Sequence, residues 1–295
     1  MQKSILREQS PVLTIGMPVY NRERFIGQAI DSLIRQSFKD FVILISDNCS
    51  TDNTPIICRK YASLDNRVKY FRQSKNIGMV ENFQFVLDIC ETKYFMWAAS
   101  DDLWSPNWID ELIKTISPGY CAIGLVKYID LQGEPIHGPA LSLRFDSPIQ
   151  ILRRIKFLWV RNPFLVYGLF NSKDIKLDWR PILGTYERGY FNYRHNGDIY
   201  LCYSILKNLR VSLSNTCTRY NRIHPENSKN LNSYPEKVVG LGITLRRYLT
   251  PIDLVIVSKI SNGLELTLGS LIYLALFTKN IFSLFAAIAK RILNR

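Results

Sequence analysis

The stretch that decides the fold is residues 94–104, YFMWAASDDLW, in which an apolar run leads directly into two adjacent carboxylates. The apolar part is typical of a buried β-strand, and Asp101 and Asp102 follow at its carboxyl end. Two neighbouring carboxylates at such a place are costly unless a cation or hydrogen bonds hold them. Carboxylate oxygens suit Mg²⁺ or Mn²⁺, ions that bind diphosphates while keeping part of their water shell.

The carboxylate pair has an alternative explanation as the start of a helix. Ser105 would then be the N-cap and Pro106 the first helical residue, with the acidic groups facing the positive end of the helix dipole. The pair alone does not decide between the two explanations. The sequence before it favours a ligand site, because other strands also end in polar loops.

The first 130 residues alternate apolar β-type runs with segments of helical period, which predicts an α/β fold with a mostly parallel sheet flanked by helices. Ligands of such sheets lie outside the carboxyl ends of the strands. Tyr20, Asp47 and the carboxylate pair all occupy such ends, so they can converge on one ligand. The expected strands cover residues 12–17, 41–45, 68–71, 94–99 and 121–128.

The overall composition indicates an anionic partner. The formal net charge is +13 over 295 residues, which fits a nucleotide-sugar, an anionic lipid surface or a nucleic acid. No basic stripe with interleaved aromatic residues is present, so we do not expect nucleic-acid binding. The six cysteines are scattered without a C-x-x-C pair, which argues against a zinc or redox site. Residues 1–10 hold no apolar signal segment, so we expect a cytoplasmic protein.

Four motifs occur in register along the first part of the chain. They are TIGMPVYN at 14–21, DNCSTDNT at 47–54, NIG at 76–78 and SDD at 100–102. Together they resemble the family 2 glycosyltransferases, which have a GT-A fold and are typically bacterial inverting enzymes that build surface polysaccharide. The resemblance covers residues 11–118 and extends to about residue 228.

The resemblance implies a GT-A domain over residues 1–232. Its nucleotide-sugar-binding half would be residues 11–118 and its acceptor half residues 119–232. A helical C-terminal region would follow at residues 233–295.

The resemblance also implies a donor site. Tyr20 would stack on the nucleobase, since stacking contributes about 1–3 kcal/mol and tolerates different bases; the alternative is a core tyrosine. Asp47 would accept the imide N–H of uracil or thymine, although a guanine edge also offers donors and an Asx-type turn is the alternative. The further donor-binding positions are Pro18, Asn21, Asn76, Gly78 and Asp101.

The metal site implied by the resemblance uses Asp102 and His224. The usual Asp-x-Asp would place a carboxylate at Ser100, and here two phosphate oxygens, His224 and waters can complete an octahedral Mg²⁺ or Mn²⁺. Residues 220–224, YNRIH, resemble the family's Y-x-R-x-H segment, in which Arg222 and His224 close over the diphosphate. The alternative for His224 is a surface or packing role.

The implied general base is Asp198, which precedes an apolar helical segment in the place where the family carries its acidic base. An inverting transfer needs such a group to take the proton of the acceptor hydroxyl. N-capping of the helix explains Asp198 equally well, and Glu187 is the reserve candidate.

The segment after Pro251 is apolar with basic ends. Its apolar stretches at 268–277 and 281–289 are too short to span a bilayer, and residues 246–295 hold seven lysines and arginines against two acidic residues. In-plane binding to an anionic membrane is one explanation. Packing on the domain or in a homodimer is the other.

We therefore expect a cytoplasmic glycosyltransferase, peripheral at the inner face of the cell membrane. It would move a sugar from a nucleotide-sugar, with UDP or dTDP favoured, to a glycan or lipid-linked acceptor. A sugar nucleotidyltransferase is the nearest rival, but the Gly-rich loop near its first strand is missing here. A non-catalytic nucleotide-sugar-binding scaffold is the rival from another class.

Overall fold

The computed structural model describes residues 11–136, 163–175, 202, 205–206 and 209–224. The chain divides into two units, Met1–Glu226 and Asn227–Arg295, and every described residue belongs to the first. The two base candidates, Asp198 and Glu187, lie outside the described residues. So does the expected helical region at 233–295.

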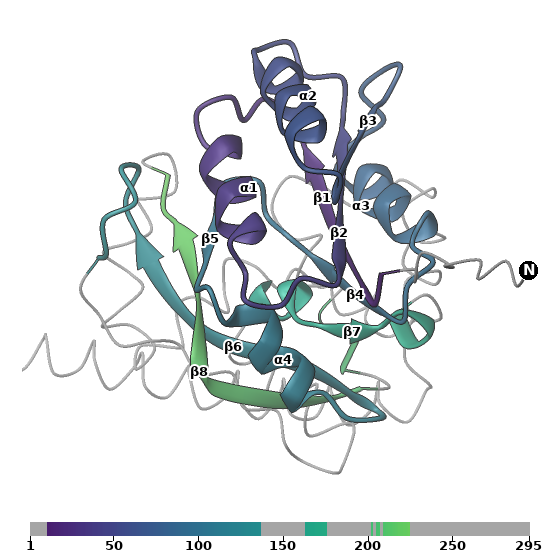
Figure 1. Cartoon of the computed structure of the whole chain (residues 1–295), viewed down its shortest axis with the longest axis vertical. Helices are drawn as coiled ribbons and strands as arrows, with labels where there is room; N and C mark the ends of the chain where they lie inside the picture. The colour runs from purple at the N-terminus through teal and green to yellow at the C-terminus, as the bar shows by residue number, and fades with distance from the viewer. Residues whose placement is uncertain (1–10, 137–162, 176–201, 203–204, 207–208, 225–295) are drawn as a thin grey trace, which may run out of the picture. The chain divides into compact units, whose positions relative to one another are not determined.

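A five-stranded sheet forms the centre of the first unit, in the order β3-β2-β1-β4-β7 (Figure 1). Its first four strands are parallel, and the short β7 pairs antiparallel with β4. Every residue of β1 is buried, as expected for a parallel strand covered on both faces. The mostly parallel α/β sheet is therefore confirmed. The strands are β1 (Leu13–Val19), β2 (Phe41–Asp47), β3 (Val68–Arg72), β4 (Tyr94–Trp97) and β7 (Phe170–Asn171).

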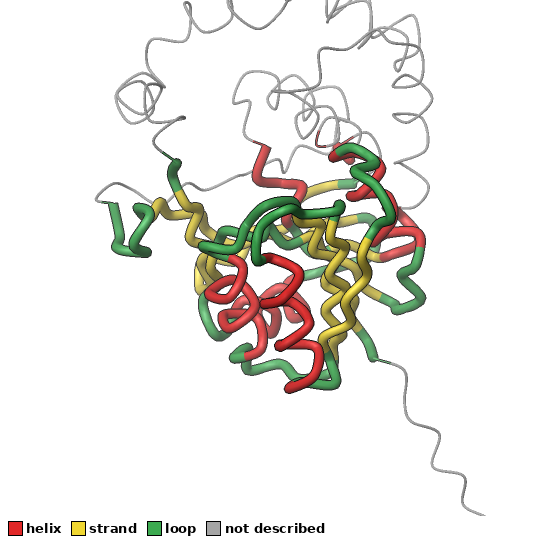
Figure 2. Tube along the Cα trace, turned by 90° about the horizontal axis from the view of Figure 1, so that it is seen from above, coloured by secondary structure: helices red, strands yellow, loops and turns green. Residues whose placement is uncertain are grey.

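Helices lie on both sides of these strands (Figure 2). The apolar spacing seen in the sequence forms the buried face of α1, at Ile26, Ala29, Ile30 and Leu33. Helix α3 packs closely on β1 at Gly16, where a Cβ atom would lie 2.7 Å from Cγ2 of Val86. The helices are α1 (Ile26–Ile34), α2 (Thr54–Leu64), α3 (Met79–Asp88) and α4 (Trp108–Thr115).

A second sheet of three strands lies beside the first, in the order β5-β8-β6 (Figure 1). Strand β8 (Arg210–Arg222) runs parallel to β6 (Tyr120–Ile129) and antiparallel to β5 (Leu103–Trp104). The sequence did not predict β5, whose two residues directly follow the carboxylate pair. Its pairing with β8 brings the end of β8 next to the end of β4, although about 120 residues separate them in the chain.

A 3₁₀-helix, η1 (Pro163–Tyr167), contacts β4 and β6. Among the residues that the structure describes, no helix combines the length and apolar character needed to cross a membrane.

Candidate active site

The two adjacent carboxylates after β4 lie in different environments. Asp102 is 3% exposed; its Oδ1 accepts a hydrogen bond from the backbone N–H of Arg222 at 2.9 Å, and its Oδ2 lies 3.2 Å from Nη2 of Arg219. The side chain of Asp101 is 19% exposed, and its Oδ2 lies 2.8 Å from Nε2 of His224 and 3.5 Å from Nε of Arg22. The pairing of β5 with β8 therefore directs one carboxylate inward and leaves the other accessible.

This placement differs from the expectation that Asp102 and His224 hold a metal ion together. Both oxygens of Asp102 are engaged inside the protein, and His224 contacts Asp101 instead. Within the described ranges, no group of three or more His, Cys, Asp or Glu side chains could hold a metal ion. A carboxylate and an imidazole can still supply two ligands to an ion whose other ligands are phosphate oxygens and water. Asp101 and His224 offer such a donor set on the more exposed side of the pair, and the metal-binding role of Asp102 stays a prediction.

The environments also set opposite pKa shifts. Burial raises the pKa of Asp102 to about 6, although the charge of Arg219 acts in the other direction. Burial also tends to raise the pKa of Asp101. The hydrogen bond to His224 and the charge of Arg22 outweigh this effect, so the pKa of Asp101 lies below its usual value. Asp101 is therefore anionic at neutral pH, as a metal-binding carboxylate must be.

Arg222 is buried next to the acidic pair. We expected it to face the diphosphate, but it is 3% exposed and its guanidinium group donates inward. Its acceptors are the backbone oxygens of Asp101 at 2.8 Å, Asp130 at 3.0 Å and Leu131 at 2.9 Å, and Oε1 of Gln28 at 2.7 Å. Four of the five N–H donors of its guanidinium group are thus engaged with protein acceptors. Arg222 instead fixes the backbone that carries Asp101.

Arg219 was not singled out from the sequence. It is 1% exposed, lies beside Asp102, and its guanidinium carbon is 4.7 Å from the ring centre of Phe164 and 4.1 Å from that of Tyr167. Cation–π contact of this kind suits arginine better than lysine. Arg219 thus connects η1 to the loop of the acidic pair. Only its position three residues before Arg222 could have indicated it.

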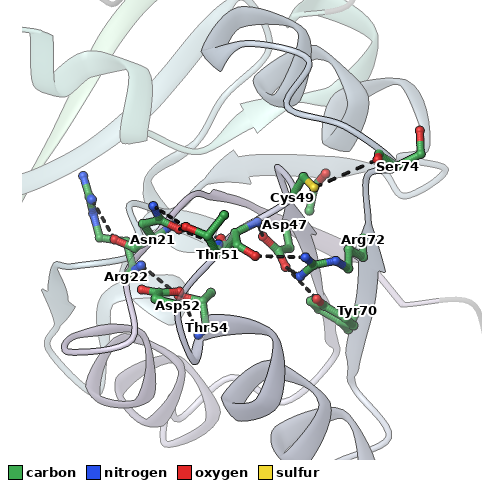
Figure 3. A network of polar contacts seen from close by, with 12 residues as sticks. Asn21, Arg22, Asp47, Cys49, Thr51, Asp52, Thr54, Tyr70, Arg72 and Ser74 are labelled. Atoms are coloured by element: carbon green, nitrogen blue, oxygen red, sulfur yellow. Dashed lines mark hydrogen bonds and ion pairs between the residues drawn. The ribbon is translucent and has the colours of Figure 1, made fainter.

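Asp47 ends β2 and is fully buried in a polar network (Figure 3). Its Oδ2 accepts hydrogen bonds from the Tyr70 hydroxyl at 2.7 Å and from Nη1 of Arg72 at 2.9 Å, and its Oδ1 accepts one from the Ser50 N–H at 2.8 Å. The expected nucleobase acceptor is therefore held by its neighbours on β3. The register opposes Asp47 and Arg72 directly. Arg72 and Tyr70 were missed because their relevance depends on strand order.

Asn76 and Gly78, both expected to bind the donor, shape the loop before α3. Nδ2 of Asn48 donates to Oδ1 of Asn76 and to the oxygen of Gly78, each at 3.0 Å. Gly78 has φ of 93°, which disfavours any other residue there. The loop is thereby fixed to the carboxyl end of β2. Their direct contacts in this structure are with protein groups.

The loop after β1 contains the remaining expected residues. Pro18 is buried in β1 opposite Ser46, and its role in donor binding stays a prediction. Asn21 has φ of 51°, and its Oδ1 accepts a hydrogen bond from the Thr51 N–H at 2.9 Å, which ties this loop to the loop after β2 (Figure 3). Tyr20 is 42% exposed. Its ring is therefore accessible for stacking, as predicted for a nucleobase platform.

The comparison with known families agrees with this arrangement. The sequence model described as Glycosyl transferase family 2 matches residues 14–170, more than half of the chain. This chain belongs to glycosyltransferase family 2. The family 2 match includes β1, β2, β4 and the acidic pair, but it ends before β8.

Two relatives show how far the family 2 similarity extends. A glycosyltransferase of Rickettsia felis is 24% identical over 254 residues, which is 83% of this chain and 40% of that protein. Glycosyltransferase GlyA of Streptococcus pneumoniae is 30% identical over 104 residues, which is 35% of this chain and 15% of GlyA. The chain thus spans less than two thirds of the length of either relative.

Solved structures of similar fold include two glycosyltransferases. S. aureus TarS in complex with UDP-GlcNAc is 17% identical with a TM-score of 0.53, covering 72% of this chain and 58% of the TarS chain. GalNAc-T7 with UDP, GalNAc and Mn²⁺ is 13% identical with a TM-score of 0.55, covering 74% of this chain and 45% of the GalNAc-T7 chain. At this level of identity the likeness supports the GT-A fold alone.

Proposed function

We propose that this family 2 protein transfers a sugar from a nucleotide-diphosphate sugar, with UDP or dTDP favoured, to a glycan or lipid-linked acceptor. The observation that carries the proposal is the Asp101–His224 pair at the carboxyl end of β4. Arg22 connects this pair to the accessible Tyr20, because it lies 3.5 Å from Asp101 and donates to the backbone oxygen of Tyr20. In the proposed arrangement the base stacks on Tyr20 and the diphosphate lies toward the acidic pair.

Asp101 and His224 are the residues that we assign to a divalent ion, Mg²⁺ or Mn²⁺. When bound, such an ion neutralises the charge of a leaving diphosphate. Arg222 fixes the segments that carry both residues, because its Nε donates to the backbone oxygen of Asp101 and its backbone N–H donates to Oδ1 of Asp102. TarS with UDP-GlcNAc and GalNAc-T7 with UDP and Mn²⁺ support a nucleotide-sugar and a divalent ion as the first ligands to try.

The site is tested by thermal-shift and calorimetric titration of the full chain with UDP, dTDP and GDP, with and without Mn²⁺, because a ligand of the folded state raises the apparent stability. Asp101→Asn should lose the Mn²⁺-dependent part of nucleotide binding. Asp110→Asn, on the exposed face of α4, is the matched control. If Asp101→Asn binds UDP with unchanged Mn²⁺ dependence, the metal assignment is wrong. Release of UDP from UDP-sugars by the wild-type protein then tests the transferase activity itself.

We also propose inversion at the anomeric carbon, with Asp198 as general base. Asp198→Asn should bind donor normally but lose about 10²–10⁴ in transfer rate, the usual contribution of a positioned base. If its turnover stays within a few-fold while Glu187→Gln is inactive, Glu187 is the base.

A cytoplasmic location at the inner face of the membrane, in surface-polysaccharide synthesis, completes the proposal. It rests on the apolar and basic composition of residues 246–295. The full chain should sediment with anionic liposomes and be released at high salt, because salt screens the electrostatic attraction. If it stays in the supernatant, the C-terminal segment serves packing or a homodimer instead.

A further inference from the structure

Three arginines lie near the acidic pair, and they differ in how firmly they are held. Arg219 and Arg222 are buried, one between aromatic rings and the other by four hydrogen bonds. The side chain of Arg22 is 42% exposed. Among the described residues, Arg22 is therefore the arginine beside the pair that can change its partner without disrupting buried structure.

The backbone of Arg22 is fixed, and its ion pair with Asp101 is weak. Its Nη1 donates to the backbone oxygens of Tyr20 at 3.3 Å and Asn21 at 3.0 Å, so Nε is the group that faces Asp101. The backbone N–H of Arg22 donates to Oγ1 of Thr54 at 2.8 Å, which ties the loop after β1 to the start of α2 (Figure 3). Its Nε lies 3.5 Å from Oδ2 of Asp101, longer than the 2.7–2.9 Å of a strong charged hydrogen bond. Exposed ion pairs contribute about 0–1 kcal/mol. Breaking this one therefore costs little.

The oxygen that Arg22 faces is the same Oδ2 that contacts His224. A divalent ion held by Asp101 and His224 competes for this oxygen and repels a guanidinium next to it. The diphosphate that accompanies the ion offers several new acceptors, and the planar fork of a guanidinium matches phosphate oxygens. Figure 3 shows the Arg22 side chain directed away from the Asp47–Arg72 pair, so it is not engaged there.

We propose that Arg22 exchanges partners during donor binding, from Asp101 to the diphosphate. This inference rests on the proposed function and adds to it a binding residue that the motifs did not indicate. Arg22 opposes binding of the bare cation, because it already neutralises Asp101. It favours the cation together with a diphosphate, because it then pairs with the added negative charge. Arg22 thereby makes cation and nucleotide diphosphate bind cooperatively, as a coupling between two ligands.

The test is isothermal titration of the full chain with three probes: Mn²⁺ alone, UDP at saturating Mn²⁺, and uridine. Arg22→Gln should weaken UDP binding about tenfold, the low end for a charged hydrogen bond because the site is partly exposed. The affinity of the variant for uridine should equal that of the wild type. Its affinity for Mn²⁺ alone should be at least as high as that of the wild type. Arg22→Lys should recover part of the UDP affinity. Arg24→Gln is the control, since Arg24 is exposed and packs on Phe25.

Three results would overturn the inference. Unchanged UDP affinity in Arg22→Gln shows that Arg22 does not reach the diphosphate. An equal loss for uridine and UDP shows that Arg22 only shapes the loop, through its bonds to the oxygens of Tyr20 and Asn21. Weaker binding of Mn²⁺ alone shows that Arg22 supports the cation instead of opposing it. If the wild type binds no nucleotide, the proposed function itself fails, which is a separate outcome.

Discussion

Replacing Arg222 by methionine separates the role that the sequence predicted from the one that the structure shows. A methionine fills similar space but donates no hydrogen bonds. The four acceptors of Arg222, three of them backbone oxygens, then lose a charged donor. If Arg222 only contacted a diphosphate, its replacement would leave the stability unchanged and weaken nucleotide binding. If Arg222 is a buried structural residue, its replacement mainly lowers the free energy of unfolding.

The expected loss follows from the bonds that the structure shows. Four hydrogen bonds to a charged donor, at about 1.5–3 kcal/mol each, sum to about 6–12 kcal/mol. Single substitutions rarely cost more than about 4–5 kcal/mol, because neighbours relax and water reaches the freed groups. Removing one partner of a buried charged network costs about 3–5 kcal/mol. We expect Arg222→Met to lower the free energy of unfolding by that amount. Arg222→Lys should have a free energy of unfolding between those of the wild type and Arg222→Met, because the lysine ammonium keeps the positive charge but not the planar arrangement of several donors.

The assay is urea denaturation of the wild type and the two variants, with the free energy of unfolding taken by linear extrapolation. Arg22→Gln serves as the surface comparison and should change the stability by less than about 1 kcal/mol. The reasoning fails if Arg222→Met unfolds within about 1 kcal/mol of the wild type. It fails more sharply if that stable variant has also lost UDP binding, since Arg222 would then be the diphosphate ligand that the motif predicted.

Three further predictions follow from single contacts. Tyr20→Ala should weaken UDP binding by about 1–3 kcal/mol, the worth of one stacked base, without changing the melting temperature, as titration and thermal unfolding will show. Gly16→Ala should cost about 1–3 kcal/mol of stability in urea denaturation, because its Cβ would lie 2.7 Å from Val86. The hydrogen bond from Arg67 lowers the pKa of Asp65, so the pair stabilises the fold above the usual aspartate pKa and loses that effect as the pH falls. Asp65→Asn should therefore unfold more easily at pH 7, by at most about 1 kcal/mol, and the difference should vanish in acid.

The strands of the first sheet could be predicted from the sequence because their signals are local. Continuous apolar runs followed by polar loops marked β1, β2 and β4 to within two residues. The same runs indicated which loops meet at the carboxyl edge of the sheet. Strand β5 could not be predicted, because a two-residue strand has no periodicity and exists only through its pairing with β8.

The sequence indicated which segments meet around the acidic pair, but not the contacts that each side chain makes there. The motif around residues 100–102 indicated the acidic pair, but which carboxylate turns inward depends on the register of Leu103 against Tyr220. Arg222 was recognised as important, yet its acceptors at Asp130 and Leu131 belong to a turn far away in the sequence. Long-range contacts of this kind leave no trace in a local pattern.

The contact between Asp101 and His224 spans 123 residues of chain, and the bond from Arg222 to the Asp101 backbone spans 121. Contacts of such high sequence separation form late in folding, because the entropy lost in closing a long loop precedes the stabilisation that the contacts give. During synthesis, the first sheet can assemble while β8 has not yet been made. At that stage Asp101 and Asp102 lack the partners that residues 219–224 supply, although Arg22 is already present beside Asp101. Any ligand that binds only the completed site would act on this last step of folding and favour the finished protein over its precursor.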